Sequence, residues 1–298
     1  MTPHARIGAL IMLVNPLSGG TGPKAVEEAK AILADYPCQS ELVTLEPGKI
    51  EAQIAEALEA KPDLLIVLAG DGTAQAVASR AGSHGPLIAP LPGGTMNMLP
   101  KALYGTTDWK AALRATLEHG TAQAVSGGVV EGQAFYCAAI LGSPALWAPA
   151  REAVRHGKLS LALTYARRAL KRAFSGRLRY GLDGAAARRA EALVLISPMI
   201  SKALDEPVGL EAAAMDPSDP AEAFRLGAHA LFDDWRRDRS VTTRPAKTIE
   251  VSARSRIPAV IDGEPTLLPH RLTVKFTPKA FRALAPDLSA DEADEASV

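Results

Sequence analysis

Residues 64–97 read LLIVLAGDGTAQAVASRAGSHGPLIAPLPGGTMN, and the rest of the chain is interpreted outward from this stretch. It contains two apolar runs, 64–69 and 86–91, which are typical of parallel strands buried on both faces. A helical pattern at 74–80 separates them. Each run ends in a turn that combines glycine with a hydroxyl side chain, and in an open α/β sheet such turns meet at the carboxyl edge. Because glycine lets the backbone approach a phosphate closely, this edge is predicted to bind a nucleoside triphosphate.

Strand and helix patterns alternate over the whole first half of the chain. Apolar runs typical of strands occur at 9–14 and 41–45, and helical spacing occurs at 24–33, 50–58 and 109–117. This order predicts a parallel sheet with helices on both faces. A third glycine turn, NPLSGG at 15–20, follows the first strand and should reach the same edge of the sheet.

After about residue 122 the pattern changes to short strands separated by Gly, Pro and Asp. Strands are expected at 125–130, 133–141, 191–197, 247–252, 259–262 and 271–276, and helices at 150–174 and 220–237. This spacing predicts an antiparallel β domain, of the sandwich kind. We therefore expect a nucleotide-binding α/β domain over 1–122 and a β-rich domain over 123–286, whose last segment could pack back on the first. An acidic tail would follow over 287–298.

Composition is ordinary for a globular protein, with 47% hydrophobic residues and a formal net charge of zero over 298 residues. A neutral chain has no overall field that would attract nucleic acid, so no nucleic-acid partner is expected. The two cysteines, Cys38 and Cys137, lie in no metal or redox spacing, which favours a cytoplasmic setting. No apolar stretch reaches the roughly 18 to 20 residues of a spanning helix. Any membrane contact is therefore expected to be peripheral.

One segment carries a strong local charge. Between residues 151 and 180, nine lysine and arginine residues face a single acid, Glu152. In the helical pattern at 163–174 one face is apolar, and the other carries Arg167, Arg168, Lys171 and Arg172. Such a helix could lie on an anionic membrane surface, where each charge contributes about 1 kcal/mol. It could equally be a solvated helix whose apolar side packs on the β domain.

Four motifs follow one another along the chain: NPLSGG at 15–20, GDGT at 70–73, PGGTMN at 92–97 and DGE at 262–264. In this order the chain resembles the catalytic domain of the diacylglycerol kinase family, which bacterial lipid kinases share with sphingosine and ceramide kinases. NAD kinases and phosphofructokinases are distant relatives. The resemblance implies a phosphofructokinase-like and NAD kinase-like first domain, and a second domain that receives the lipid. It implies a kinase that uses ATP and Mg²⁺ to phosphorylate a hydroxyl of a neutral membrane lipid.

Carried over position by position, the resemblance implies a nucleotide site at the sheet edge. The implied nucleotide-binding residues are Asn15, Pro16, Ser18, Gly19, Thr44, Gly70, Asp71, Gly72, Thr73, Gln75, Gly93, Gly94, Thr95 and Asn97. The metal ligands would be Asp71 and Asp262, because Mg²⁺ prefers oxygen ligands. Some of these residues allow a simpler interpretation. Asn15 and Thr95 could only cap a turn or a helix, and Thr44 could be an ordinary strand-end residue.

The DGE turn would supply the catalytic base. Phosphoryl transfer to an alcohol needs a group that orients the hydroxyl and accepts its proton. The resemblance implies Glu264 for this role, with Asp262 as a metal-side or orienting partner and Asp71 as a competing base. The sequence does not decide between the three carboxylates, and read alone residues 262–264 could be a plain hairpin turn.

The chain departs from the family's usual pattern at Ala69, Gln75, Ala76 and Met98. Ala76 replaces a carboxylate that often engages the sugar side of the nucleotide, so nucleoside recognition is expected to differ. Diacylglycerol is the first candidate substrate, with ceramide or a sphingoid base as competitors, and the oligomeric state is left open. Two other functions remain as alternatives: a non-catalytic nucleotide-binding regulator, and a soluble kinase of the NAD kinase type.

Overall fold

The computed structural model describes residues 7–147, 177–201, 208–217, 222 and 235–288. The chain divides into two compact units. The first contains the residues up to Val125 together with those from Lys279 onward, and the second contains Ser126–Pro278. The chain passes from one unit to the other within β5 (Thr121–Val130) and within β16 (Arg271–Ala285).

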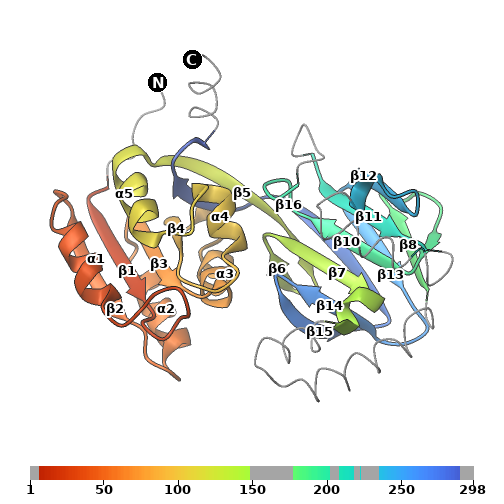
Figure 1. Cartoon of the computed structure of the whole chain (residues 1–298), viewed down its shortest axis with the longest axis horizontal. Helices are drawn as coiled ribbons and strands as arrows, with labels where there is room; N and C mark the ends of the chain where they lie inside the picture. Colours follow the sequence, from red (N-terminus) through yellow and green to blue (C-terminus); the bar gives the residue numbers. More distant parts are fainter. Residues whose placement is uncertain (1–6, 148–176, 202–207, 218–221, 223–234, 289–298) are drawn as a thin grey trace, which may run out of the picture. The chain divides into compact units, whose positions relative to one another are not determined.

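The first unit is built on a parallel sheet with strand order β2-β1-β3-β4 (Figure 1). Its strands are β1 (Ala9–Val14), β2 (Gln39–Thr44), β3 (Leu64–Ala69) and β4 (Leu87–Pro92). Every residue of β3 and β4 is buried, which explains their uninterrupted apolar sequences. The end of β16 adds a further parallel strand beside β4, where Ala283 pairs with Ile88.

Helices cover both faces of this sheet. They are α1 (Ala25–Leu33), α2 (Ile50–Glu59), α3 (Asp71–Ala81), α4 (Met98–Tyr104) and α5 (Trp109–His119), with a short 3₁₀ turn η1 (Gly82–His84). Because β1-to-β2 runs one way across the sheet and the next two crossovers run the other way, right-handed connections place α1 opposite α2 and α3. An ion pair between Arg80 and Glu51 joins α3 to α2, and one between Lys110 and Glu28 joins α5 to α1.

The second unit is a sandwich of antiparallel sheets. One sheet has the order β12-β11-β10-β7-β14-β15, and the other contains β16-β13-β8-β9 with β5 and β6. The strands are β6 (Gln133–Phe135), β7 (Ala138–Gly142), β8 (Leu178–Leu182), β9 (Arg188–Ala190), β10 (Ala192–Ile196), β11 (Leu210–Met215), β12 (Val241–Ala246), β13 (Thr248–Ser252), β14 (Ile257–Ile261) and β15 (Glu264–Leu268). Short 3₁₀ turns are η2 (Ser143–Trp147) and η3 (Trp235–Arg237).

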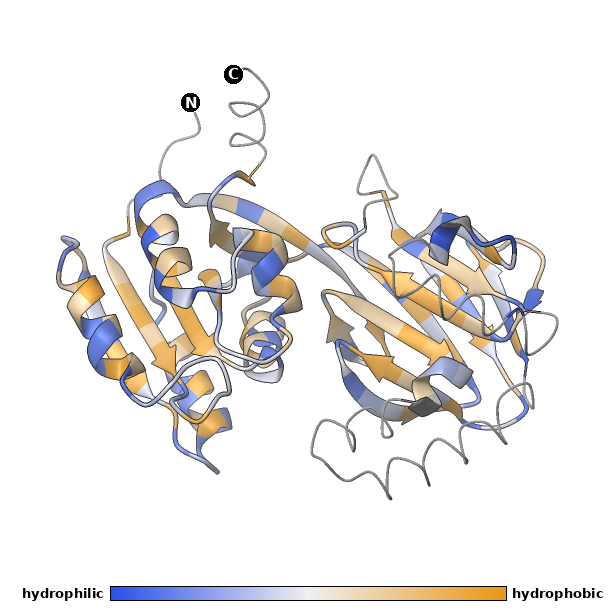
Figure 2. Ribbon diagram, in the orientation of Figure 1, coloured by the Kyte–Doolittle hydropathy of each residue, from blue (hydrophilic) through white to orange (hydrophobic). Residues whose placement is uncertain are grey.

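Residues of both sheets form one apolar core between them. Leu141 and Leu195 enter it from the first sheet, and Ile249 and Val274 enter it from the second, all fully buried. Figure 2 shows the strands mostly in hydrophobic colours, whereas α1 alternates hydrophobic and hydrophilic residues. The predicted fold class, a parallel α/β domain followed by an antiparallel β-sandwich, is confirmed.

Several elements differ from the sequence prediction. The strand expected at 133–141 is interrupted at Tyr136 and Cys137, and the strand expected to end at 276 continues to Ala285. The prediction missed α4 and the strands β8, β9, β11, β12 and β15. In β11, whose sequence is LEAAAM, packing overrides the helical preference of alanine. The helix expected at 150–174, with Arg167, Arg168, Lys171 and Arg172, lies outside the described residues.

The described part of the chain contains no helix with the length and apolar character needed to cross a membrane.

Candidate active site

Three turns of the first unit meet at the carboxyl edge of the parallel sheet, after β1, β3 and β4. Backbone hydrogen bonds join them. The amide of Asn15 donates to Leu68 O at 2.9 Å, and the amide of Gly20 donates to Gly93 O at 3.1 Å. The buried hydroxyl of Thr21 donates to the same Gly93 oxygen at 3.2 Å. The turns therefore form one connected loop structure.

This close packing leaves no room for side chains at two of the glycines. A Cβ on Gly93 would lie 2.7 Å from the backbone nitrogen of Ala69, and a Cβ on Gly20 would lie 2.7 Å from Gly94 O. Gly72, in the first turn of α3, is different because no atom lies within 4 Å of a Cβ built there. The space above this turn is open. The free N–H groups and the positive dipole end of α3 can therefore reach a phosphate.

Asn97 connects two of the turns. Its side-chain oxygen accepts a hydrogen bond from the amide of Gly94 at 2.8 Å, and its side-chain nitrogen donates to Gly94 O at 3.0 Å. Its own amide donates to Oδ2 of Asp71 at 3.2 Å. The residue is buried and has φ of 49°, a conformation that asparagine tolerates better than most residues. Among the described residues, the other carboxylate oxygen of Asp71 has no hydrogen-bond partner.

The other predicted nucleotide-binding residues occupy the same turns or their margins. Asn15 holds its own turn, because its side-chain oxygen accepts a bond from the amide of Leu17 at 3.1 Å. Thr44 is exposed at the end of β2, and its carbonyl accepts a bond from Gln53 at 2.9 Å. The remaining members are Pro16, Ser18 and Gly19 after β1, Gly70, Thr73 and Gln75 around the start of α3, and the exposed Thr95 after β4. The structure thus gathers these residues at one edge of one unit.

Asp262 and Glu264 belong to the second unit. Asp262 and Gly263 form the two-residue turn between β14 and β15, with φ of 45° and 93° as a type I′ hairpin turn requires. The carboxylate of Asp262 accepts hydrogen bonds from the amides of Tyr136, Cys137 and Ala138, at 2.7, 2.9 and 2.9 Å. Its acceptor capacity is therefore largely used. Glu264, two residues later, is exposed.

The same arrangement occurs at a second turn of this unit. Asp183 and Gly184, between β8 and β9, also have positive φ values. The carboxylate of Asp183 accepts bonds from the amides of Lys247 and Thr248, at 3.0 and 2.8 Å. An Asp-Gly turn that holds a neighbouring strand is therefore a repeated structural feature here. The hydrogen bonds of Asp262 do not by themselves indicate catalysis.

No three His, Cys, Asp or Glu side chains of the described residues are grouped so that they could hold a metal ion. A site with fewer protein ligands still fits Mg²⁺, because this ion commonly binds one or two carboxylates together with substrate phosphates and water. The half-buried Asp71, with its free oxygen at the start of α3, is a suitable carboxylate.

Residues 9–129 match the family model of the diacylglycerol kinase catalytic domain. The match includes all three turns of the sheet edge. This segment is therefore similar to the diacylglycerol kinase catalytic domain. The resemblance inferred from the motifs is thereby confirmed, and the match supports a kinase. No curated protein sequence matches the chain.

Solved structures share the fold of both units. A diacylglycerol kinase from Bacillus anthracis str. Sterne gives a TM-score of 0.69 at 15% identity, covering 95% of this chain and 99% of that one. A candidate diacylglycerol kinase of the same organism gives 0.70 at 20% identity, covering 96% and 99%. An NAD kinase from Archaeoglobus fulgidus, in complex with ATP, gives 0.50 at 12% identity, covering 92% of each chain. At these identities the likeness concerns the fold alone.

Sequence reasoning missed one residue of the edge and one set of contacts. Thr21 follows the NPLSGG motif directly, and a hydroxyl residue beside two glycines was the signal that could have marked it. The amides of 136–138 could not have been linked to Asp262, because a bond between residues about 125 positions apart leaves no local pattern.

Proposed function

We propose that this kinase transfers the γ-phosphate of ATP to a hydroxyl of a neutral membrane lipid, with diacylglycerol as the first candidate. One observation carries the proposal. In the matched catalytic domain, three glycine turns are bonded into one edge that is closed at Gly93 and open at Gly72, beside the half-free carboxylate of Asp71. Such an edge suits an extended polyphosphate better than a compact neutral ligand.

The triphosphate would lie against the first turn of α3. Backbone N–H groups there would bind phosphate oxygens, and the hydroxyls of Ser18, Thr73 and Thr95 would donate further hydrogen bonds. Asn97 would keep this surface in place, because it holds Gly94 and the carboxylate of Asp71 at once. Positioning of this kind is most of what phosphoryl transfer asks of a protein.

The base of the nucleotide would meet apolar side chains. Among the described residues of the first unit, two large apolar side chains are exposed, Leu17 at 74% and Met96 at 39%, and they lie on two of the three turns. A purine has an apolar face that such side chains can cover. This arrangement offers a nucleoside contact in a chain that has Ala76 where the family often carries a carboxylate.

Asp71 would hold Mg²⁺ through its free oxygen. When bound, the metal neutralises charge on the phosphates and so favours attack by the lipid hydroxyl. We assign the proton-accepting role to Glu264, because it is exposed and no partner occupies it among the described residues. Asp262 is less suited to accept the proton, since its carboxylate already receives three backbone bonds. Its role would be to fix the turn from which Glu264 projects.

The lipid would be held by the β-rich second unit, and the basic segment with Arg167, Arg168, Lys171 and Arg172 would contact an anionic membrane surface. Both assignments extend the resemblance of the sequence to lipid kinases. They predict a protein that works peripherally at the membrane, on the cytoplasmic side.

A transfer assay with radiolabelled ATP and Mg²⁺ tests the proposal. Mixed micelles would present diacylglycerol, ceramide or a sphingoid base, and NAD would serve as a soluble acceptor. We expect label in one lipid product, and its loss in Asp71→Asn. Glu59→Gln is the matched control, because this exposed carboxylate lies at the end of α2 that leads to the opposite edge of the sheet. Label in NAD alone, or ATP binding with no labelled acceptor, would overturn the proposal.

A further inference from the structure

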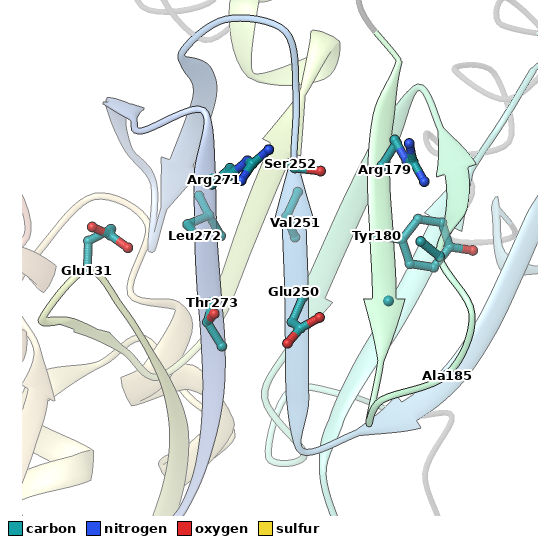
Figure 3. A pocket seen from close by; sticks show the side chains of 12 residues that line it. Glu131, Arg179, Tyr180, Ala185, Glu250, Val251, Ser252, Arg271, Leu272 and Thr273 are labelled. Carbon is teal, nitrogen blue, oxygen red and sulfur yellow. The ribbon is translucent and has the colours of Figure 1, made fainter.

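The second unit carries a row of arginines across neighbouring strands. Arg189 of β9 lies opposite Arg179 of β8, which lies opposite Ser252 of β13, which in turn lies opposite Arg271 of β16. We call these four residues the arginine row. Residues directly opposite each other in antiparallel strands place their side chains on the same face of a sheet. Figure 3 shows Arg179, Ser252 and Arg271 in line across three strands.

The arginine row lies on the outer face of the sandwich. The neighbours of its members along the strands, Tyr180, Val251 and Leu272, belong to the buried core. Since successive residues of a strand point to opposite faces, the row must point away from that core. The three arginines are exposed accordingly.

A groove of about 650 Å³ includes three members of the row, Arg179, Ser252 and Arg271. Glu250 and Thr273, which are opposite each other one step further along the strands, also line it, as does Glu131. The groove therefore has a cationic end and a part lined by carboxylates (Figure 3). An anion would be confined to the arginine end, because the carboxylates repel it elsewhere.

Within the part of the chain that the structure describes, no ion pair compensates the positive charges of the row. Among the described residues, Arg179, Arg189 and Arg271 have no ion-pair partner, whereas the nearby Arg177 pairs with Asp216 at 3.4 Å. Like charges directly opposite each other destabilise a sheet, and Arg179 and Arg189 are such a pair. No ion pair among the described residues offsets this repulsion. An anionic ligand would.

We propose that the arginine row is a binding site for phosphate groups, presented by the headgroups of anionic phospholipids. The planar guanidinium binds two phosphate oxygens at once, and the Ser252 hydroxyl can donate between two arginines. With strands about 4.8 Å apart, the row spans about 14 Å, which is more than one phosphate group requires. The row also continues the excess of basic residues found at 151–180. The phosphate site stands by itself, and only the choice of a lipid source rests on the proposed function.

Vesicle binding tests the lipid source. The full chain would be sedimented with phosphatidylcholine vesicles, with and without phosphatidylglycerol. We expect binding that requires the anionic lipid, weakens with added salt, and falls about 25-fold in the double variant Arg179→Gln/Arg271→Gln, at about fivefold for each charge. Arg244→Gln is the matched control, because Arg244 is exposed on β12 of the other sheet and should leave binding nearly unchanged.

Thermal unfolding in inorganic pyrophosphate tests the free-phosphate source. Stabilisation of the wild type by pyrophosphate that is lost in the double variant, without any difference in vesicle binding, would assign the row to a soluble phosphate compound. Equal vesicle binding and equal pyrophosphate stabilisation in wild type and double variant would overturn the site altogether.

Two further measurements, the Tm without ligand and the rate of phosphate transfer, distinguish loss of the phosphate site from loss of the fold or of the kinase reaction. Without ligand, the double variant and the edge-strand variant Arg189→Gln should melt at or above the wild-type temperature, because repulsion is removed. A clear drop in Tm would mean that the arginines support the sheet, and would contradict the proposal. Transfer to lipid in detergent micelles should be unchanged in these variants, so a failure of the phosphate site leaves the proposed function standing.

Discussion

At the scale of single residues, two glycines at the carboxyl edge of the parallel sheet differ in their surroundings. Gly93 sits where a Cβ would press on the backbone of Ala69, whereas a Cβ on Gly72 would meet open space. Gly93 is therefore required by the fold, whereas the fold leaves room for a side chain at position 72. The two glycines look alike in the sequence, and only their surroundings distinguish them.

Replacing each glycine by alanine should therefore have different effects. Gly93→Ala should lower the free energy of unfolding by about 1 to 3 kcal/mol, the usual cost of forcing extra atoms into a packed site. Gly72→Ala should keep or raise Tm, because alanine favours the helix by up to about 1 kcal/mol, but it should raise the KM for ATP. Thermal melts and initial rates measure both effects. A Gly72→Ala variant with unchanged KM would place the phosphates elsewhere.

Asp262 can be tested against Asp183, its structural counterpart. Asp262→Ala and Asp183→Ala should each lower the free energy of unfolding by about 2 to 4 kcal/mol, and Tm with it. Each change leaves backbone amides of a neighbouring segment without a charged acceptor. The Mg²⁺ concentration that gives half-maximal rate should be unchanged in the folded Asp262→Ala protein. If that variant kept the wild-type Tm and needed much more Mg²⁺, Asp262 would be a metal ligand instead.

At the scale of elements, one carboxylate joins the starts of the neighbouring strands β1 and β3. Asp63 accepts hydrogen bonds from the amides of Gly8 and Ala9, at 2.8 and 3.0 Å. These bonds hold the pKa of the Asp63 carboxyl below its ordinary value of 3.8. Because the pKa is lower in the folded state, the ionised carboxylate stabilises the fold at pH values above its ordinary pKa. This contribution is lost as the pH falls through the folded pKa.

Asp63→Ala should therefore have a pH-dependent effect. Near neutral pH the variant should melt below the wild type, and the difference in Tm should shrink as the pH is lowered well past 3.8. Melting curves across that range measure it. A difference in Tm that stays constant with pH would show that the side chain acts through packing and not through its charge.

The elements also show what the sequence could and could not predict. Strands β1, β3 and β4 were predictable because burial on both faces leaves an unbroken apolar run. The turns at the carboxyl edge of this sheet were predictable because glycine and hydroxyl residues follow those runs. Strand β11 was not, since its sequence LEAAAM favours a helix by local propensity.

Distant partners account for what remained unpredictable. In β11 a fully buried Glu211 is held by Arg236 at 2.6 Å and by Ser201 at 2.5 Å. The break between β6 and β7 likewise depends on amides that bond to Asp262. These contacts form only when the sheets are assembled, so they cannot be predicted from residue type or from spacing in the sequence.

At the scale of the whole molecule, the first unit is completed by residues from the end of the chain. Phe281 and Leu284 are buried in it, and the buried hydroxyl of Tyr104 donates to Leu284 O at 3.4 Å. Burial raises the pKa of Tyr104 far above its ordinary value, so this hydroxyl stays protonated. The family match at 9–129 therefore covers the motifs of this unit but not all of its core.

A fragment of residues 7–125 should accordingly be less stable than the same unit in the full chain. It lacks the strand that pairs with β4, and its apolar edge would be exposed. Joining residues 279–288 to the fragment through a flexible linker should restore a cooperative melt, followed by circular dichroism. A fragment that melts cooperatively without them, at the same temperature, would show that the returning strand is dispensable.

The most direct test of the proposed activity is the rate of phosphate transfer from radiolabelled ATP to diacylglycerol in mixed micelles, measured for wild type, Glu264→Gln and the control Glu59→Gln. Glu264 is exposed, so Glu264→Gln should keep the wild-type Tm. Loss of the proton acceptor should lower kcat by about 10²- to 10⁴-fold, while Glu59→Gln stays at the wild-type rate. Transfer by Glu264→Gln at the wild-type rate, or no labelled lipid from the wild type, would contradict the assignment of this chain as a lipid kinase with Glu264 as its base.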